Sequence, residues 1–210
     1  MANKKISEIL KILDEMYPDS RCYLDYETPW QLLTATILSA QCTDARVNII
    51  TKDLFKKYPT AGALADADFA ELAQDIRGAG FYNSKARNII ECMKVIHYEY
   101  LDEVPDDIDK LTSLAGVGRK TANVIRGNIY NIPSIVVDTH VKRISNRLGL
   151  VSDEDPVKIE YELMKILPKE HWISYNTQVI AFGRQICKAQ SPKCQECPLV
   201  HHCKYQKNRK

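Results

Sequence analysis

The sequence Leu111-Thr-Ser-Leu-Ala-Gly-Val-Gly-Arg-Lys-Thr-Ala-Asn-Val124 places two glycines, Gly116 and Gly118, between a short helical pattern and a longer one. Glycine permits a tight turn and lets another backbone approach closely. The amides of such a turn and of the next helix N-terminus point outward, which suits a phosphate group. A dinucleotide fold would need a preceding strand and a third glycine, and both are missing. A phosphate-binding hairpin and a plain helix-helix turn remain as alternatives.

Helical patterns continue on both sides of this hairpin. Apolar residues recur at 6, 9, 10, 13 and 16, and Tyr17-Pro18-Asp19 then ends that first helix. Further helices are predicted at 29–40, 44–58, 66–75, 84–100, 107–113, 119–130, 140–148, 155–166 and 171–187. Only 135–137 has the pattern of an extended segment, and it is too short to start a sheet. The predicted fold class is all-α.

The composition is that of an ordinary globular protein. Of 210 residues, 45% are hydrophobic and 27% are charged, which excludes a disordered chain and a disulfide miniprotein. The uncharged stretch 28–43 is shorter than the roughly 18 residues of a membrane span and contains polar residues, so we expect a buried helix there. The N-terminus lacks an apolar signal region. We therefore expect a cytoplasmic protein without a membrane partner.

Charge is distributed unevenly along the chain. The total is +2, but residues 116–152 contain six basic residues and one acid, and residues 187–210 contain the same numbers. Each of these segments carries +5, so the remainder of the chain carries −8. Such segregation suits a surface that binds a polyanion such as nucleic acid. Solvated helical faces are the simpler alternative.

Two residues of the first basic segment are candidates for chemistry. Lys120 falls in the first turn of a predicted helix, beside Arg119 and near the positive end of its dipole. Both influences favour the neutral amine, which is the form that attacks carbon in Schiff-base chemistry. A phosphate contact is the alternative for Lys120.

Asp138 is the only acid of that segment and precedes a predicted helix, so it also fits an N-cap. A carboxylate that faces a sugar carbon is the expected partner in cleavage of a glycosidic bond. His140 and Arg143 fit either a structural role or a phosphate contact, and the sequence leaves both open.

Four of the seven cysteines are crowded near the C-terminus. Cys187, Cys194, Cys197 and Cys203 form the pattern C-x6-C-x2-C-x5-C. In a cytosolic chain such thiols ligate a metal rather than pair as disulfides. Zinc usually takes two C-x2-4-C pairs, and only Cys194 and Cys197 have that spacing. Four well-separated thiolates suit an iron-sulfur cluster, which the spacing favours over zinc.

Five features together identify a family. They are Leu38-Ser-Ala-Gln41, Gly80-Phe-Tyr-Asn-Ser-Lys-Ala86, Gly116-Val-Gly-Arg-Lys-Thr-Ala-Asn-Val124, Val137-Asp-Thr-His140 and the four terminal cysteines. On these motifs, and over nearly its whole length, the chain resembles endonuclease III, the DNA glycosylase and abasic-site lyase of the helix-hairpin-helix superfamily.

The resemblance implies a two-domain helix-hairpin-helix glycosylase fold. A six-helix barrel would comprise residues 22–132, and a discontinuous iron-sulfur cluster domain would comprise residues 1–21 and 133–210. The four cysteines would hold a [4Fe-4S] cluster with a structural role. Lys120 and Asp138 would face each other across a cleft that receives a flipped nucleotide, because an enzyme that acts on a base must take it out of the stack.

The resemblance also implies a set of DNA contacts. Gln41 would plug the gap left by the flipped nucleotide, and Phe81 would wedge beside the orphaned base. The family usually has Leu at this wedge position, so Phe81 is a departure. The loop with Lys188 and Lys193 would press against phosphates. The remaining predicted contacts are Gly116, Val117, Gly118, Arg119, His140 and Arg143.

The implied reaction is attack of Lys120 on C1′ with loss of an oxidised pyrimidine, followed by β-elimination that cuts the strand. The expected partner is double-stranded DNA with a damaged pyrimidine or an abasic site, and the expected form is a monomer in the cytoplasm. A monofunctional mismatch or adenine glycosylase is one alternative, although such relatives generally lack an amine at this position. A non-catalytic DNA-binding module with a redox-sensing cluster is another alternative.

Overall fold

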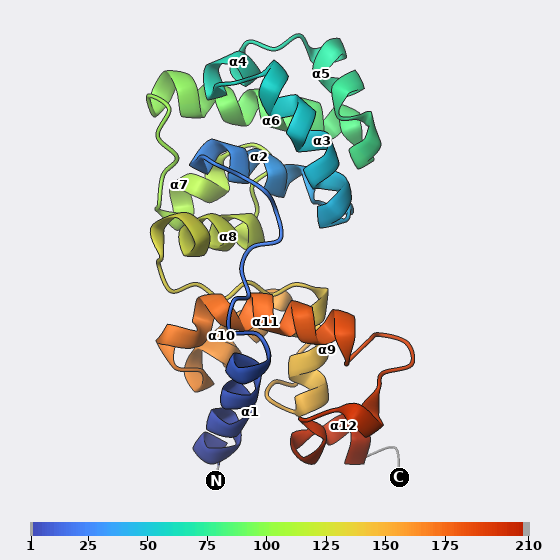
Figure 1. Cartoon of the computed structure of the whole chain (residues 1–210). Helices are drawn as coiled ribbons and strands as arrows, with labels where there is room; N and C mark the ends of the chain where they lie inside the picture. The colour runs from blue at the N-terminus through green and yellow to red at the C-terminus, as the bar shows by residue number, and fades with distance from the viewer. Residues whose placement is uncertain (1, 208–210) are drawn as a thin grey trace. The chain divides into compact units, whose positions relative to one another are not determined.

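The computed structural model describes residues 2–207, and these form helices joined by turns without a β-strand. The predicted all-α class is confirmed. The chain divides into two compact units, one of which is Cys22–Ile132. The other contains the described parts of Met1–Arg21 and Pro133–Lys210, so it is built from both ends of the sequence (Figure 1). None of the helices in the described residues has the length and apolar character needed to cross a bilayer.

The unit Cys22–Ile132 contains a helix that is buried on all sides, α2 (Pro29–Leu38). Every residue of α2 from Trp30 to Leu38 is buried, and the hydroxyls of Thr34 and Thr36 are satisfied by backbone oxygens of the same helix. Thr28 begins the helix with a capping box, because its side chain accepts from the N–H of Gln31 and the Gln31 side chain accepts in return. The buried helix predicted at 29–40 is confirmed, but it ends two residues earlier.

The α-helices that follow α2 in this unit are α3 (Asp44–Lys57), α4 (Ala61–Ala65), α5 (Phe69–Asp75), α6 (Tyr82–Lys94), α7 (Ile108–Ser113) and α8 (Arg119–Tyr130). Of these, α3, α6 and α8 pack against α2. Helix α6 packs against α2, α4 and α5, and α8 packs against α2 and α7. The sequence prediction missed α4, because its five residues are too short to show a helical period. It also merged α6 with the π-helical turn Val95–Glu99 that follows it.

The other unit joins α1 (Ala2–Met16) to the helices after Pro133. These are α9 (Thr139–Leu148), α10 (Pro156–Ile166), α11 (Trp172–Gln185) and α12 (Lys204–Lys207). Ile9 and Leu13 of α1 are buried in the same core as Tyr175 and Phe182 of α11. The Tyr175 hydroxyl shares a hydrogen bond of 2.9 Å with Ser145 of α9, so this buried polar group is satisfied. Figure 1 shows α1 and α11 together in this unit.

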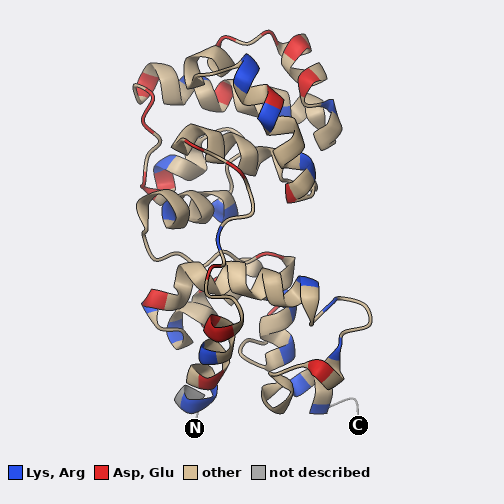
Figure 2. Cartoon of the chain, in the orientation of Figure 1, with Lys and Arg blue, Asp and Glu red and all other residues tan. Residues whose placement is uncertain are grey.

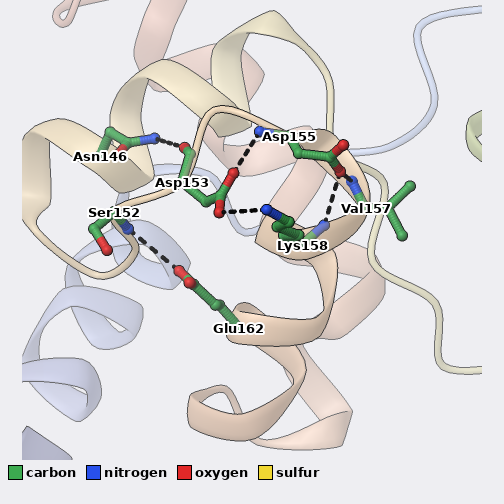
Figure 3. A network of polar contacts seen from close by, with 7 residues as sticks. All are labelled: Asn146, Ser152, Asp153, Asp155, Val157, Lys158 and Glu162. Carbon is green, nitrogen blue, oxygen red and sulfur yellow. Dashed lines mark hydrogen bonds and ion pairs between the residues drawn. The ribbon is translucent and has the colours of Figure 1, made fainter.

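A polar network braces the connection between α9 and α10 (Figure 3). The Asn146 side chain donates to the backbone oxygen of Asp153 at 3.0 Å, and the N–H of Ser152 donates to Glu162 at 3.2 Å. The N–H of Asp155, 2.8 Å from the Asp153 carboxylate, holds the pKa of that carboxyl below its usual value. These contacts fix α9, whose N-cap is Asp138, to the helix that follows it.

Candidate functional site

The hairpin between α7 and α8 turns at Gly116. The N–H of Val117 donates to the Leu114 oxygen at 3.1 Å, which closes the turn. Gly116 has φ +76°, and a Cβ atom there would lie 2.9 Å from Cβ of Asn88. Both the backbone conformation and the close approach to α6 therefore require glycine. Val117 is buried, so it anchors the hairpin in the core of its unit.

Gly118 is the N-cap of α8, and its surroundings differ from those of Gly116. Its φ is −92°, and a Cβ atom there would meet no described atom within 4 Å. Glycine has no side chain, so the N-cap residue itself offers no side-chain acceptor to the first turn of α8. A phosphate can take that place at a helix N-terminus. Lys120, the second residue of α8, is exposed.

Asp138 begins α9 in the other unit. One of its carboxylate oxygens accepts the N–H of Val141 at 2.8 Å, so Asp138 is the N-cap of α9. The residue is half-buried. A carboxylate has two oxygens and about four lone pairs, so one cap bond does not exhaust its capacity to accept a proton or face a cation.

His140 and Arg143 lie in the first turns of α9 and point toward the interior of their unit. The Arg143 guanidinium donates to Nδ1 of His140 and to the oxygen of Cys187, both at 3.1 Å. A Cβ atom on Gly183 of α11 would lie 2.4 Å from Nδ1 of His140, which shows how closely these groups pack. Burial lowers the pKa of Arg143. Both side chains have a structural role, and their contact with DNA stays a prediction.

Arg147, which the sequence analysis counted only as part of a basic segment, is joined to the cysteine loop. Its guanidinium donates to the oxygens of Lys188 at 2.7 Å and Ala189 at 2.9 Å, and lies 3.3 Å from Sγ of Cys187. It also stacks on the ring of Tyr205, 4.6 Å from the ring centre. Part of the positive charge of the basic segment 116–152 thus binds groups within the same unit and is not directed to solvent. Only the tertiary arrangement could reveal this, because a sequence carries no sign of which arginine turns inward.

Gln41 and Phe81 both lie in the unit Cys22–Ile132, at the ends of helices. Gln41 follows α2 and has φ +54°, and Phe81 is the N-cap of α6 with φ +49°. Residues other than glycine seldom adopt this left-handed conformation. Both side chains are exposed, Phe81 to 66% although it is apolar. The role of Gln41 and Phe81 as a wedge pair stays a prediction.

The four cysteines lie in a loop that is folded onto the core of its unit. All four are free thiols and all are partly buried. Cys187, Cys197 and Cys203 pack against the core formed by α1, α9, α10 and α11. The pKa of the Cys197 thiol is raised to about 11, chiefly by burial and in smaller part by the thiols of Cys187, Cys203 and Cys194. The four sulfur atoms therefore influence one another.

The donor set suits an iron-sulfur cluster. Four cysteine thiols lie within residues 187–203, and all four are partly buried. Four soft sulfur donors are the ligands that such a cluster takes. Among the described residues, no three His, Cys, Asp or Glu side chains are placed to hold one metal ion.

Lys188 and Lys193 are exposed in the loop between Cys187 and Cys194. Lys193 forms an ion pair of 3.6 Å with Glu196, and both partners are largely in solvent. Figure 2 shows Lys and Arg on this loop and on α8 and α9. Residues 208–210 of the predicted basic segment lie outside the described residues. Figure 2 also shows Asp and Glu on α5 and near α7, in agreement with the predicted acidic remainder of the chain.

Comparison with known proteins identifies the family. Residues 34–169 match the profile of the HhH-GPD superfamily base excision DNA repair proteins, and residues 187–203 match that of the iron-sulfur binding domain of endonuclease III. Endonuclease III of Synechocystis sp. is 48% identical over 97% of this chain and 94% of the relative. The same enzyme of Bacillus subtilis is 46% identical over 96% and 92%. The chain belongs to the endonuclease III family.

A solved structure of a trapped endonuclease III–DNA covalent intermediate matches the chain with a TM-score of 0.94 at 47% identity, covering 100% of this chain and 99% of that one. A thermostable thymine-DNA glycosylase matches at 22% identity with a TM-score of 0.86 over 98% of both chains, and it shares the fold. Family membership makes the chain a bifunctional DNA glycosylase and AP lyase of base excision repair that binds DNA. The predicted [4Fe-4S] cluster is confirmed over zinc.

Removal of one ligand tests the cluster assignment. We expect Cys197→Ala to lose most of the bound iron and to make 187–203 sensitive to protease, because metal binding contributes directly to the folding of such a loop. Iron analysis and limited proteolysis measure both effects. Cys22→Ala, a change at a half-buried cysteine of the other unit, should keep its iron. Full iron content in Cys197→Ala would exclude this thiol as a ligand.

Proposed function

We propose that Lys120 is the nucleophile that removes oxidised pyrimidines from duplex DNA and that Asp138 assists it. One observation carries the proposal: an exposed lysine follows a glycine hairpin in the first turn of a helix whose N-cap is Gly118. A relative at 47% identity has been trapped in a covalent complex with DNA. A covalent intermediate needs a nucleophilic side chain, and an amine that attacks a sugar carbon supplies one.

The chemistry follows from these two groups. The neutral amine of Lys120 attacks C1′ while the bond from C1′ to the base breaks, and the base leaves with the bonding electrons and takes up a proton. The Asp138 carboxylate stabilises the positive charge that develops on the sugar and accepts a proton from the attacking amine. The sugar ring then opens to give a Schiff base between Lys120 and C1′.

The Schiff base then makes strand cleavage possible. It acidifies the proton on C2′, and loss of that proton breaks the bond from C3′ to the 3′ phosphate oxygen. Water finally hydrolyses the imine and regenerates the amine of Lys120. The [4Fe-4S] cluster supplies no step of this route and serves to hold the loop that carries Lys188 and Lys193.

The DNA contacts belong to the same proposal. Gln41 fills the gap left by the extruded nucleotide, and Phe81 wedges beside the base that loses its partner. The exposed position of both side chains supports these roles. Phe81 is larger and flatter than the family's usual leucine. Its ring therefore stacks on a base as well as separating two neighbouring bases. Gly116, Val117, Gly118 and Arg119 form the phosphate-binding hairpin.

The two hairpin glycines give a matched test of the phosphate site. We expect Gly116→Ala to cost about 1–2 kcal/mol of folding stability, because alanine must adopt a left-handed φ there. Gly118→Ala should change stability by less than about 1 kcal/mol, since its φ is ordinary and its Cβ meets nothing. Gly118→Ala should instead weaken DNA binding, because the methyl group occupies the approach of a phosphate. Urea unfolding and binding titrations measure the two effects. Unchanged affinity in Gly118→Ala would exclude this phosphate contact.

Borohydride reduction tests the proposed function as a whole. The native chain is mixed with duplex DNA that carries one thymine glycol, and the imine is reduced as it forms. A covalent protein–DNA band is the expected result. Base release without an adduct would mean that water is the nucleophile and that the enzyme is monofunctional. Neither release nor adduct, with DNA binding retained, would favour a non-catalytic module.

We also propose that the enzyme acts as a monomer in the cytoplasm. The support is that each unit encloses its own core and that solved relatives of this chain bind DNA. Light scattering on the purified protein, alone and with DNA, measures the stoichiometry. A mass of two chains at working concentration would contradict the monomer.

A further inference from the structure

Lys85 on α6 is a buried lysine, with only 4% of its surface exposed. Lysine is almost never fully buried unless its charge is paired. Here the partners are three backbone oxygens, those of Leu38 at 2.8 Å, Ala40 at 2.7 Å and Ala79 at 2.8 Å. An ammonium group has three N–H donors and no acceptor, so all its hydrogen-bonding capacity is used.

The three oxygens belong to two loops that are far apart in the sequence. Leu38 and Ala40 lead into the loop 39–43 between α2 and α3, which we call the Gln41 loop. Ala79 ends the short 3-10 helix Arg77–Ala79, and residues 77–81 form what we call the Phe81 loop. One nitrogen atom therefore holds both loops, immediately before Gln41 and two residues before Phe81.

Neighbouring contacts complete the attachment. The oxygen of Phe81 accepts the backbone N–H of Lys85 at 3.1 Å and the Ser84 hydroxyl at 2.9 Å. The Arg46 side chain of α3, the helix that follows the Gln41 loop, donates to the oxygen of Gly78 in the Phe81 loop at 3.3 Å. Phe81, with its left-handed backbone, is thus attached to the first turn of α6, the helix that carries Lys85.

Stability alone does not account for a lysine at this place. A buried charge loses its hydration, and well-packed apolar residues often stabilise a core as well or better. What an apolar residue cannot do is bind three carbonyl groups from two loops at fixed distances. The lysine therefore fixes the positions of the three carbonyl groups, and so of the two loops, relative to one another.

We propose that Lys85 is a positioning residue for base extrusion, holding the Gln41 loop and the Phe81 loop together so that both side chains enter the DNA stack as one unit. The inference rests on the roles proposed above for Gln41 and Phe81. It predicts that loss of the lysine affects a step which needs both wedge residues and leaves the chemistry of Lys120 intact.

The test compares two DNA substrates in Lys85→Met, which keeps the length of the side chain but removes its donors. We expect single-turnover removal of thymine glycol from a duplex to fall by up to about 10²-fold, as for a misplaced group remote from the reacting atoms. Borohydride trapping on a single-stranded oligonucleotide with an abasic site should stay at the native rate. That substrate has no opposing base to separate, so its rate depends on Lys120 and not on the wedge.

Two controls separate positioning from simple loss of stability. Lys94→Met makes the same change at an exposed position of the same helix and should behave as the native chain. Ile89→Ala, at a fully buried apolar position of α6, should lower the melting temperature without changing the ratio of the two rates. A fall of both rates together in Lys85→Met would overturn the proposal. Should Lys85→Met not fold, Lys85→Gln, which keeps two N–H donors, should show the same change in ratio to a smaller extent.

A double-mutant cycle decides whether Lys85 acts through the wedge residues. Adding Lys85→Met to Gln41→Ala/Phe81→Ala should cost no further duplex activity, since nothing remains to be positioned. Independent, multiplying losses would overturn the inference. If Gln41→Ala/Phe81→Ala alone left the duplex rate unchanged, the proposed wedge roles would fail, and this inference with them. If that pair lost activity while Lys85→Met did not, only the inference would fail.

Discussion

Lys120→Ala should form no borohydride-trapped adduct with thymine-glycol or abasic-site DNA, and its strand cleavage should fall by at least about 10³-fold, as expected when a nucleophile is removed. Binding to the damaged duplex should remain, because the hairpin amides and the wedge residues are untouched. Gel analysis of the trapped complex and single-turnover cleavage measure the two effects. The exposed position of Lys120 means that alanine leaves no cavity, so folding stability should change little.

Lys52→Ala is a matched control, because Lys52 is an exposed lysine on α3 away from the hairpin. It should trap and cleave like the native chain. If Lys120→Ala still formed the adduct, another amine would be the nucleophile and the assignment would be wrong. If it lost the adduct but released the base at the native rate, Lys120 would serve only the lyase step.

Asp138→Asn should lower the rate of base removal by about 10²–10⁴-fold, the range for loss of a group that transfers a proton. Its folding stability should change by less than about 0.5 kcal/mol, because asparagine is as good an N-cap as aspartate. Asp138→Ala should lose the same activity and about 1 kcal/mol of stability as well, since the bond to the N–H of Val141 is lost. The pair of variants separates the cap from the chemistry.

Asp155→Asn is the control for this pair. Asp155 caps α10 by accepting the N–H groups of Val157 and Lys158, and it has no assigned role in the reaction. Its amide variant should keep native activity. Native base removal in Asp138→Asn would show that the N-cap is the whole function of Asp138.

Much of the fold could be predicted because its signals are local. Helix α8 begins at Arg119 and ends at Tyr130 as predicted, since glycine precedes it and the left-handed Asn131 follows it. Asp155 and Pro156 mark the start of α10 in the same way. The resemblance to the family assigned roles to the candidate residues, and those roles stay predictions; the structure supplies the surroundings of each residue.

The contacts of buried cations could not be predicted in this way. In the sequence, Lys85 is one polar residue within a helical pattern. No neighbouring residue indicates that its amine binds three backbone oxygens. Arg147 contributes to a basic segment by charge count, yet its guanidinium binds the loop after Cys187. In both cases the acceptors are backbone oxygens, which every residue has, so the sequence carries no mark of them.

The discontinuous unit has a consequence for how the protein is made. Helix α1 is synthesised before the unit Cys22–Ile132, but the core that buries Ile9 and Leu13 includes α11, which is synthesised after that unit. The intervening unit can fold during synthesis, while the apolar face of α1 stays exposed until α11 is made. The four cysteines follow α11 in the sequence. The cluster ligands are therefore complete only after both segments of this unit have been synthesised.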